Sequence, residues 1–450
     1  MMSLSEAAAA MQGRLGGPDV RFAGVSTDSR SIGRGELFVA IRGERFDGHE
    51  FIGTAGERGA SAAMVDERFR LRPPLPAVIV EDTRKALGRL GRYWRKRFSP
   101  VVIGIAGANG KTTTKEMLAS ILRAHAGAAA VLATKGNLNT DIGVPMTVLQ
   151  LNDPHRYCAI ELGMNHPGEI EWLAGIAQPT IAVVTNAQRE HMEFMRSIEA
   201  SAQENSNVLR ALPALGVAVV NADDACTPIF LDAAGQRQVV DFGLERKATV
   251  TGGCTLGQLS SEILVRTPKG EARASLAIPG LHNVRNAVAA AACAHAAGIP
   301  LEAIGSGLDA FRPFAGRLQV MRTRGGATLI DDSYNANPDS VRAAIDVLAA
   351  CPAPIALVLG DMGEVGEHGP AFHREVGEYA RSRGIGALYA LGEASREAVK
   401  AFGAGARHFA SPEELVKALP REATLLVKGS RFMRMERVVA ALTGEAQGGH

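Results

Sequence analysis

One short stretch, GANGKTTT at residues 107–114, limits what this chain can fold into more than any other. It follows an apolar run at residues 101–105, and helix-forming residues continue from 115 to 123. Glycines let a backbone turn tightly enough for successive N–H groups and a helix N-terminus to point at phosphate oxygens. The strict phosphate-loop pattern fails because isoleucine holds its first glycine position, and the spacing is G-x-x-G-x-x-G-K-T instead. The order of strand, glycine turn and helix predicts an α/β nucleotide-binding unit, in which Lys111 supplies a cation and Thr112 a hydroxyl for Mg²⁺.

Strands and helices alternate along most of the chain. Apolar runs of strand length stand at residues 37–41, 77–80, 157–160, 181–185, 217–220, 328–330, 355–359 and 425–427. Nearly continuous apolar runs are typical of parallel strands that are covered on both faces. A chain of 450 residues is long enough for about three domains. We therefore predict the α/β fold class with three domains: a small N-terminal α/β domain at residues 1–83, a central phosphate-loop domain with a mostly parallel sheet at 84–313, and a C-terminal Rossmann-like domain at 314–450.

The composition excludes several function classes. The 49 basic and 47 acidic residues leave a formal net charge of +2, without the basic excess that nucleic-acid binding requires. Five cysteines are scattered with no close pair, which fits neither a disulfide framework nor a zinc site and indicates a reducing compartment. No apolar stretch approaches membrane-spanning length. We expect a cytoplasmic monomer whose partners are small molecules.

Two residues are candidate ligands for the divalent cation that accompanies a nucleotide. Glu161 follows the predicted strand at 157–160, and a carboxylate at the carboxyl end of a parallel strand faces the crevice where nucleotides bind. His191 follows the strand at 181–185 in a similar way. Mg²⁺ prefers oxygen ligands, so the carboxylate is the stronger candidate of the two.

The remaining motifs resemble those of the Mur ligases over nearly the whole chain. They are STDSR at 26–30, DGH at 47–49, the variant phosphate loop, NLNTDIGVP at 137–145, ELGMNHPGE at 161–169, HNVRN at 282–286, GR at 316–317, DDSYNANP at 331–338, LGDMGE at 359–364 and KGSR at 428–431. Several are weak alone, but their order and spacing together are specific. The runs NHPG and DSYN are most similar to the members that add D-alanyl-D-alanine to a UDP-N-acetylmuramoyl-tripeptide. Members that add diaminopimelate or lysine, and folylpolyglutamate synthase, are the alternatives within the ligases.

The resemblance implies an N-terminal domain that holds the UDP moiety, a central ATPase domain and a C-terminal domain that closes over both. It also assigns roles to matching residues. ATP would be bound by Gly107, Ala108, Asn109, Gly110, Lys111, Thr112, Thr113, Asn283, Asn286, Arg317 and Asp332. The other substrates would be bound by Asp28, Ser29, Arg30, His49, Asn137, Asn139, Thr140, Tyr334, Asn335, Asn337, Lys428 and Arg431, the last two at the start of a late helix. Lys111, Glu161 and His191 would be catalytic, and Thr112, Glu161 and His191 would hold Mg²⁺.

The chemistry implied by the family explains why these residue types are needed. A carboxylate resists attack by an amine, because its leaving group would be oxide, so ATP first converts it into an acyl phosphate. Lys111 and Mg²⁺ would offset the charge on the β- and γ-phosphates. Either His191 or water could take the proton of the amine. A phosphate-loop kinase or an ATP-gated binding protein is the alternative from another class, but it leaves the last third of the chain without a role.

One departure from the family pattern stands out. Many Mur ligases carry a carbamylated lysine after the metal-binding histidine, whereas this chain has no lysine between Lys135 and Lys247. Counting from His191 places Asn205 at that position. The loss of the carbamate leaves the site short of an anion. We hypothesise that a bound chloride fills the gap, with Glu204 or Glu199 turned inward, or water alone, as the alternatives.

Overall fold

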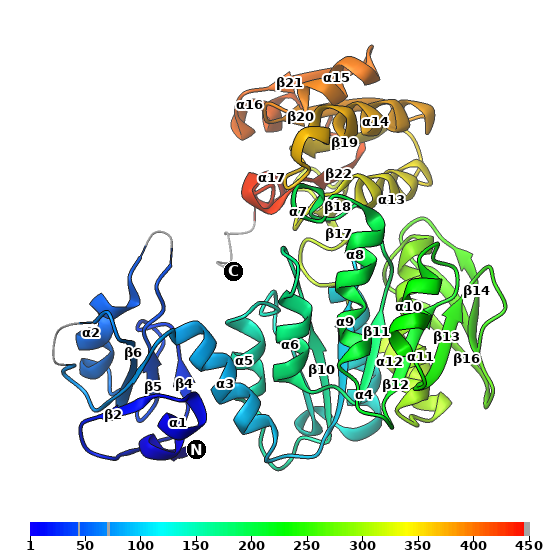
Figure 1. Cartoon of the computed structure of the whole chain (residues 1–450). Coiled ribbons are helices and arrows are strands. Elements are labelled where there is room, and N and C mark those ends of the chain that lie inside the picture. The colour runs from blue at the N-terminus through cyan, green and yellow to red at the C-terminus, as the bar shows by residue number, and fades with distance from the viewer. Residues whose placement is uncertain (44–45, 70–72, 445–450) are drawn as a thin grey trace.

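The computed structural model describes residues 1–43, 46–69 and 73–444, and the chain forms three sheet-based units in the predicted order (Figure 1). The N-terminal unit has a five-stranded sheet in the order β2-β7-β6-β5-β4, with β4 to β7 parallel and β2 antiparallel. Its elements are β1 (Met2–Ser3), α1 (Leu4–Met11), β2 (Arg14–Gly16), β3 (Arg21–Phe22), β4 (Val25–Ser26), β5 (Leu37–Val39), α2 (Ile52–Glu57), β6 (Ala62–Asp66) and β7 (Ala77–Val80).

The central unit has a nine-stranded sheet in the order β16-β15-β14-β13-β12-β11-β8-β10-β9. Its strands are β8 (Val101–Ala106), β9 (Val131–Ala133), β10 (Tyr157–Glu161), β11 (Ile181–Val184), β12 (Val217–Asn221), β13 (Gln238–Gly243), β14 (Val250–Leu256), β15 (Ser261–Thr267) and β16 (Gly270–Leu276). Its helices are α4 (Lys111–Ala126), α5 (Gly143–Val148), α6 (Glu169–Ala177), α7 (Met192–Met195), α8 (Ile198–Asn205), α9 (Asn207–Arg210), α10 (Thr227–Ala234), α11 (Leu281–Ala296) and α12 (Leu301–Ala310). All pairings from β9 to β14 are parallel, and only β14, β15 and β16 pair antiparallel.

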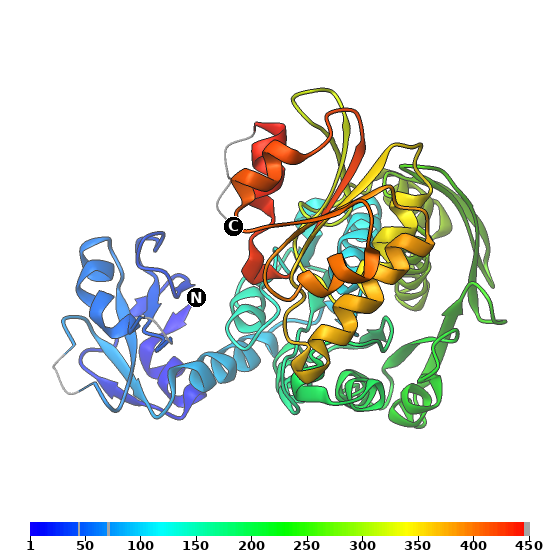
Figure 2. The same ribbon diagram turned by 90° about the horizontal axis from the view of Figure 1, so that it is seen from above.

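The C-terminal unit has a six-stranded sheet in the order β17-β18-β22-β19-β20-β21, which is parallel except for β17. Its elements are β17 (Gln319–Arg322), β18 (Thr328–Asp332), α13 (Pro338–Ala349), β19 (Ile355–Gly360), α14 (Gly369–Ser382), β20 (Ala387–Leu391), α15 (Arg396–Phe402), β21 (Ala406–Phe409), α16 (Pro412–Ala418), β22 (Thr424–Lys428) and α17 (Glu436–Thr443). Figures 1 and 2 show this unit over the central one, with the N-terminal unit to the side.

The strands of the central sheet are buried on both faces, as their apolar runs predict. Ile103 and Ile105 of β8 join the hydrophobic core that contains α4 and α11. Val102 before them and Ala106 after them join a second core under α6, α9 and α10. Successive side chains of a strand point to opposite faces, so a continuous apolar run fills both cores at once. The mixed α/β class with mostly parallel sheets is confirmed.

The antiparallel strands β14 to β16 were not predicted. Along β15 buried residues such as Ile263 and Val265 alternate with the exposed Glu262 and Arg266. One face of these strands meets the core and the other faces solvent, so no continuous apolar run marks them. Among the described residues, no helix combines the length and the apolar character that crossing a membrane requires.

Helix α3 (Thr83–Arg95) connects the N-terminal unit to the central one. It packs against α1 on one side and against α5 and α6 on the other. A Cβ atom on Gly88 would lie 2.6 Å from the Trp172 ring, and one on Gly91 would lie 2.9 Å from Pro145. The two glycines, one helical turn apart, therefore allow α3 to approach its neighbours at a distance that alanine would not permit.

Candidate active site

A cleft of about 1220 Å³ lies between the central and C-terminal units. Its floor is formed where β8, β10 and β11 end, and its roof comes from the residues that follow β18 and β22. Parallel sheets place ligand sites at the carboxyl ends of their strands, and both sheets do so here. The predicted residues that line the cleft are Ala108, Asn109, Gly110, Lys111, Thr112, Thr113, Asn137, Asn139, Thr140, Glu161, His191, Asn283, Asn286, Arg317, Asp332, Tyr334, Asn335, Asn337, Lys428 and Arg431.

The phosphate loop joins β8 to α4 and requires glycine at two positions. Gly107 and Gly110 have φ angles of +127° and +82°, which side chains rarely adopt. A Cβ atom would lie 2.2 Å from Thr185 Oγ1 at Gly107 and 2.1 Å from Asn286 Oδ1 at Gly110. Helix α4 begins at Lys111, so its free N–H groups face the cleft. The loop geometry therefore fits an anion such as a nucleotide phosphate.

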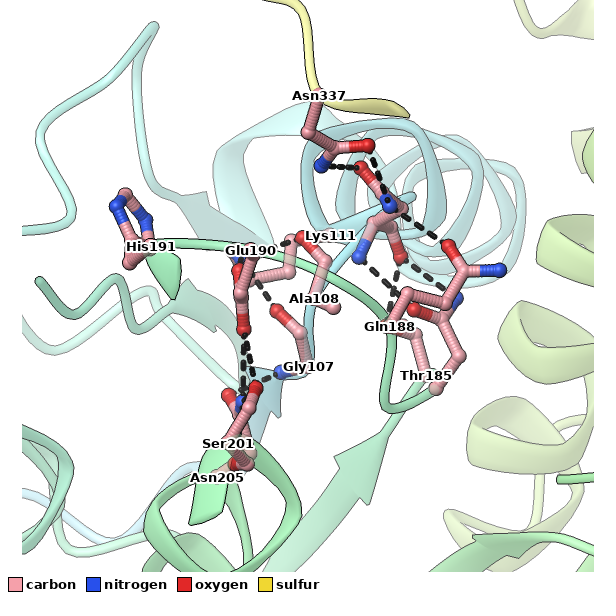
Figure 3. A network of polar contacts seen from close by, with 12 residues as sticks. Gly107, Ala108, Lys111, Thr185, Gln188, Glu190, His191, Ser201, Asn205 and Asn337 are labelled. Atoms are coloured by element: carbon pink, nitrogen blue, oxygen red, sulfur yellow. Dashed lines mark hydrogen bonds and ion pairs between the residues drawn. The ribbon is translucent and has the colours of Figure 1, made fainter. Parts of the chain in front are cut away.

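Lys111 folds back over this loop. Its Nζ donates to the carbonyl oxygen of Gly107, lies 3.0 Å from the carbonyl oxygen of Ala108 and lies 3.2 Å from Oε2 of Glu190 (Figure 3). The ammonium has three hydrogens and three partners. Glu190, whose side chain is 4% exposed, was not among the predicted residues.

Glu161 is the last residue of β10 and has one carboxylate oxygen in use and one free. Oε1 accepts hydrogen bonds from Thr112 Oγ1 at 3.0 Å and from Asn139 Nδ2 at 2.8 Å. Oε2 is buried and has no hydrogen-bond partner among the described residues. A buried carboxylate oxygen next to a threonine hydroxyl at a phosphate loop is a suitable donor for Mg²⁺. These two residues therefore fit the predicted metal position.

His191 contacts the C-terminal unit. It precedes α7 in a left-handed conformation, and its Nδ1 lies 2.7 Å from Oε2 of Glu364, in the C-terminal unit. The His191 ring holds the pKa of the Glu364 carboxyl below its ordinary value. Within the described ranges, no three His, Cys, Asp or Glu side chains gather as a metal-binding group. Glu161 and His191 both line the cleft, and the His191 ring contacts Glu364 there.

The predicted adenine-side residues lie at the start of α11. Asn283 donates to the carbonyl oxygen of Pro279 at 2.7 Å and accepts from Asn286 Nδ2 at 3.2 Å. The ring of His282 beside them is half-buried, and the loss of solvation lowers its pKa to about 4, so it is neutral at pH 7. The pair of asparagines forms a polar, uncharged patch that is suited to a base.

The C-terminal unit contributes cations and an aromatic ring. Arg317 lies over the Tyr334 ring at 4.1 Å, and its Nη2 lies 3.4 Å from Thr112 Oγ1. Burial raises the pKa of Tyr334. Lys428 Nζ contacts Asp332 Oδ2 at 2.5 Å and the carbonyl oxygen of Asn335 at 2.9 Å. The position predicted for Lys428 was wrong, because it ends β22 rather than opening a helix; its burial lowers its pKa despite the adjacent carboxylate.

Two groups of contacts join the units and were not predicted. The side chains of Asn109 and Asn337 exchange hydrogen bonds of 2.9 and 3.3 Å. Arg189 pairs with Asp339 at 2.5 Å and with Glu375 at 2.7 Å. Only the asparagines lay in recognised motifs, and no sequence signal connected Arg189 to residues more than a hundred positions later.

The predicted UDP-binding residues form a separate group in the N-terminal unit. Arg30 pairs with Asp28, whose pKa falls to about 2 through the bonds it accepts from Arg30, and Ser29 between them is buried. His49 is also buried, with Nδ1 at 2.6 Å from Asp47 and Nε2 accepting from the backbone N–H of Asp66 at 3.0 Å. These four residues, all in the described part of the chain, lie outside the cleft.

Family models match each of the three units. The Mur ligase middle domain matches residues 105–294, the Mur ligase glutamate ligase domain matches 316–431, and the Mur ligase catalytic domain matches 21–95. A relative from Escherichia coli strain K12, a UDP-N-acetylmuramoyl-tripeptide–D-alanyl-D-alanine ligase, is 38% identical over 98% of both chains. The chain belongs to the Mur ligase family.

Solved Mur ligase structures share the fold. MurF from Acinetobacter baumannii superposes with a TM-score of 0.89 at 34% identity and covers 98% of both chains. MurF from Thermotoga maritima in complex with ADP gives a TM-score of 0.80 at 25% identity, over 94% of this chain and 97% of that one. The three-unit architecture is therefore that of a Mur ligase. Together with the full-length relatives, it makes the chain an ATP-dependent ligase.

In this Mur ligase, the position of the family's carbamylated lysine is occupied by a buried asparagine. Asn205 ends α8 and is fully buried behind the phosphate loop. Glu204 does not turn toward it, because its carboxylate accepts from the N–H groups of Gly168 and Ile170 at the start of α6. Glu199 is exposed. Neither alternative carboxylate therefore supplies the missing charge.

Proposed function

We propose that this Mur ligase joins D-alanyl-D-alanine to a UDP-N-acetylmuramoyl-tripeptide, with ATP converted to ADP and phosphate. The main support is the cleft, where the phosphate loop and Glu161 of the central unit face Arg317, Tyr334 and Lys428 of the C-terminal unit. The full-length relatives that carry this activity in their names support the choice of substrates.

The first step transfers the γ-phosphoryl group to the terminal carboxylate of the tripeptide. The bond between the γ-phosphorus and the bridging oxygen breaks, a bond to a carboxylate oxygen forms, and ADP leaves. Lys111 offsets negative charge at the phosphates, and the loop N–H groups hold them in line for the transfer. Arg317 approaches Thr112 from the opposite unit and adds a second cation at the same place.

The second step forms the amide. The amine of D-alanyl-D-alanine attacks the acyl carbon, the tetrahedral intermediate loses phosphate, and the nitrogen loses its proton. The C-terminal unit covers the cleft, and water would otherwise hydrolyse the acyl phosphate.

We include Mg²⁺ as a cofactor, held by Thr112 and Glu161, with His191 as a further ligand once substrates are bound. Bound there, the ion would draw charge from the phosphates as a Lewis acid.

Mn²⁺ can replace Mg²⁺ as a probe of this site, because its binding is measured by electron paramagnetic resonance. Glu161→Gln should weaken Mn²⁺ binding in the presence of ADP about tenfold or more, whereas Glu169→Gln, an exposed carboxylate in the same segment, should not. Equal Mn²⁺ affinity in the parent and Glu161→Gln would contradict the assignment.

The cytoplasm is the location we propose, because the cysteines of the described chain are all free. We also propose that the protein is a monomer, which light scattering can measure.

The activity is tested by phosphate release and by the mass of the product, which should exceed that of the tripeptide acceptor by the dipeptide minus water. Release should require ATP, the tripeptide acceptor and D-alanyl-D-alanine together, with L-alanyl-L-alanine as the matched control. A product that retains phosphate would indicate a kinase instead.

A further inference from the structure

A group of three polar side chains is buried directly behind the phosphate loop. Asn205 and Ser201 of α8 are 0% exposed, and Glu190, from the segment after β11, has a side chain 4% exposed (Figure 3). Buried polar groups are retained at a cost unless their hydrogen bonds are complete. Their contacts show what each group does.

Asn205 connects the loop to Glu190. Its Oδ1 accepts from the backbone N–H of Gly107 at 2.7 Å, so its nitrogen must point the other way. Nδ2 donates to Oε1 of Glu190 at 2.9 Å and to the carbonyl oxygen of Ser201 at 3.0 Å. Both amide hydrogens are therefore in use, and the expected chloride loses the donor on which it depended.

Glu190 is held on one side and faces Lys111 on the other. Its Oε1 also accepts from Ser201 Oγ at 3.1 Å, and its Oε2 lies 3.2 Å from Lys111 Nζ. Two neutral donors fix the first oxygen, so the second can only point toward the ammonium. The anion that this site needs is thus a side chain of the chain itself.

We propose that Glu190 is the positioning residue for the phosphate-loop lysine, and that Asn205 and Ser201 fix its carboxylate, so that the site requires neither a carbamate nor a bound anion. This inference rests on the ligase activity proposed above. Glu190 keeps Lys111 against the loop before the nucleotide arrives. The phosphates then meet a cation whose position is already set, which reduces reorganisation during phosphoryl transfer.

Glutamine cannot replace Glu190 in this arrangement. If its amide oxygen accepts from Asn205 and Ser201, its NH₂ group faces the Lys111 ammonium, and two donors then oppose each other. In the reverse orientation the NH₂ group faces the donors of Asn205 and Ser201, so two donors oppose each other on that side instead. Glu190→Gln should therefore displace Lys111, while the loop N–H groups and the adenine-side residues still bind nucleotide.

The test compares Glu190→Gln with Glu204→Gln. Glu204 is a similarly buried glutamate on α8, but it contacts α6 and Asn207 and not Lys111. Calorimetry gives the Kd of ADP, steady-state kinetics give kcat, and thermal unfolding gives Tm. Glu190→Gln should lower kcat by about tenfold or more while the Kd of ADP changes less than about threefold. Glu204→Gln should keep kcat within about twofold of the parent, whatever its Tm.

A second variant covers the case in which Glu190→Gln does not fold. Asn205→Asp keeps the acceptor for Gly107 but places a second carboxylate against Glu190, and it should lower kcat in the same way. For the parent enzyme, exchange of chloride for glutamate at constant ionic strength, or added bicarbonate, should leave kcat unchanged.

Three results would overturn the inference: a near-parental kcat in Glu190→Gln, equal losses in both glutamate variants, or dependence of the parent on chloride or bicarbonate. Absence of ligation by the parent would instead count against the proposed function, so the two failures are distinct.

Discussion

Replacing Arg189 with alanine should loosen the C-terminal unit from the central one. The guanidinium pairs with Asp339 and Glu375 and lies over the Phe372 ring at 5.1 Å. Exposed ion pairs contribute about 0.2–1 kcal/mol, whereas breaking a fully buried pair costs about 3–5 kcal/mol. The three charged side chains are 19%, 22% and 31% exposed, so about 2 kcal/mol is a fair intermediate value. A change of about 2 kcal/mol raises the open fraction about thirtyfold.

Hydrogen exchange of residues 311–318, which connect the two units, measures this opening. Exchange there should speed up by about thirtyfold in Arg189→Ala, because it follows the open population. Arg383→Ala is the control, since Arg383 pairs with Asp346 at 2.8 Å within the C-terminal unit and both side chains are nearly half exposed. It should change the exchange rate by about twofold at most. A folded Arg189→Ala variant that exchanges like this control would refute the reasoning.

Three further predictions concern the cleft and its closure. Lys111→Ala should abolish acyl phosphate formation without unfolding the protein, since it removes a phosphate clamp and no core volume; near-normal ADP production would argue against the phosphate-loop assignment. His282 has a folded pKa of about 4 against about 6.5 when unfolded, so the stability it contributes is intact above pH 6.5 and is lost as the pH falls toward 4, by roughly 3 kcal/mol in total. Unfolding of His282→Gln should accordingly depend less on pH between 6.5 and 4.5, and parallel curves for variant and parent would contradict this. An ATP analogue with the UDP-linked tripeptide should reduce the radius of gyration as the three units close on the ligands, and an unchanged scattering profile would count against closure.

The sequence predicted those parts of the site that depend on local pattern. A glycine turn between a strand and a helix has a fixed geometry, so Lys111 and Thr112 could be placed, and a carboxylate at a strand end could be placed beside them. The partners of Lys111 could not be found in this way. Glu190 adjoins the recognised His191, yet its role depends on Asn205, which reaches it only through the packing of α8 behind the loop. The pair formed by Asn109 and Asn337 spans 228 positions, a separation for which spacing carries no information.

Helix α3 also sets the distance between the N-terminal unit and the central unit. Gly88 and Gly91 bring it close to Trp172 and Pro145, and the N-terminal unit is carried on its other side. This crossing therefore sets the separation between the predicted UDP-binding residues and the phosphate loop before ligands bind. A methyl group at either glycine would push the helix outward and lengthen that gap. The UDP end and the peptide end of the proposed acceptor would then no longer reach their two sites together, even though every residue that touches the acceptor stayed the same.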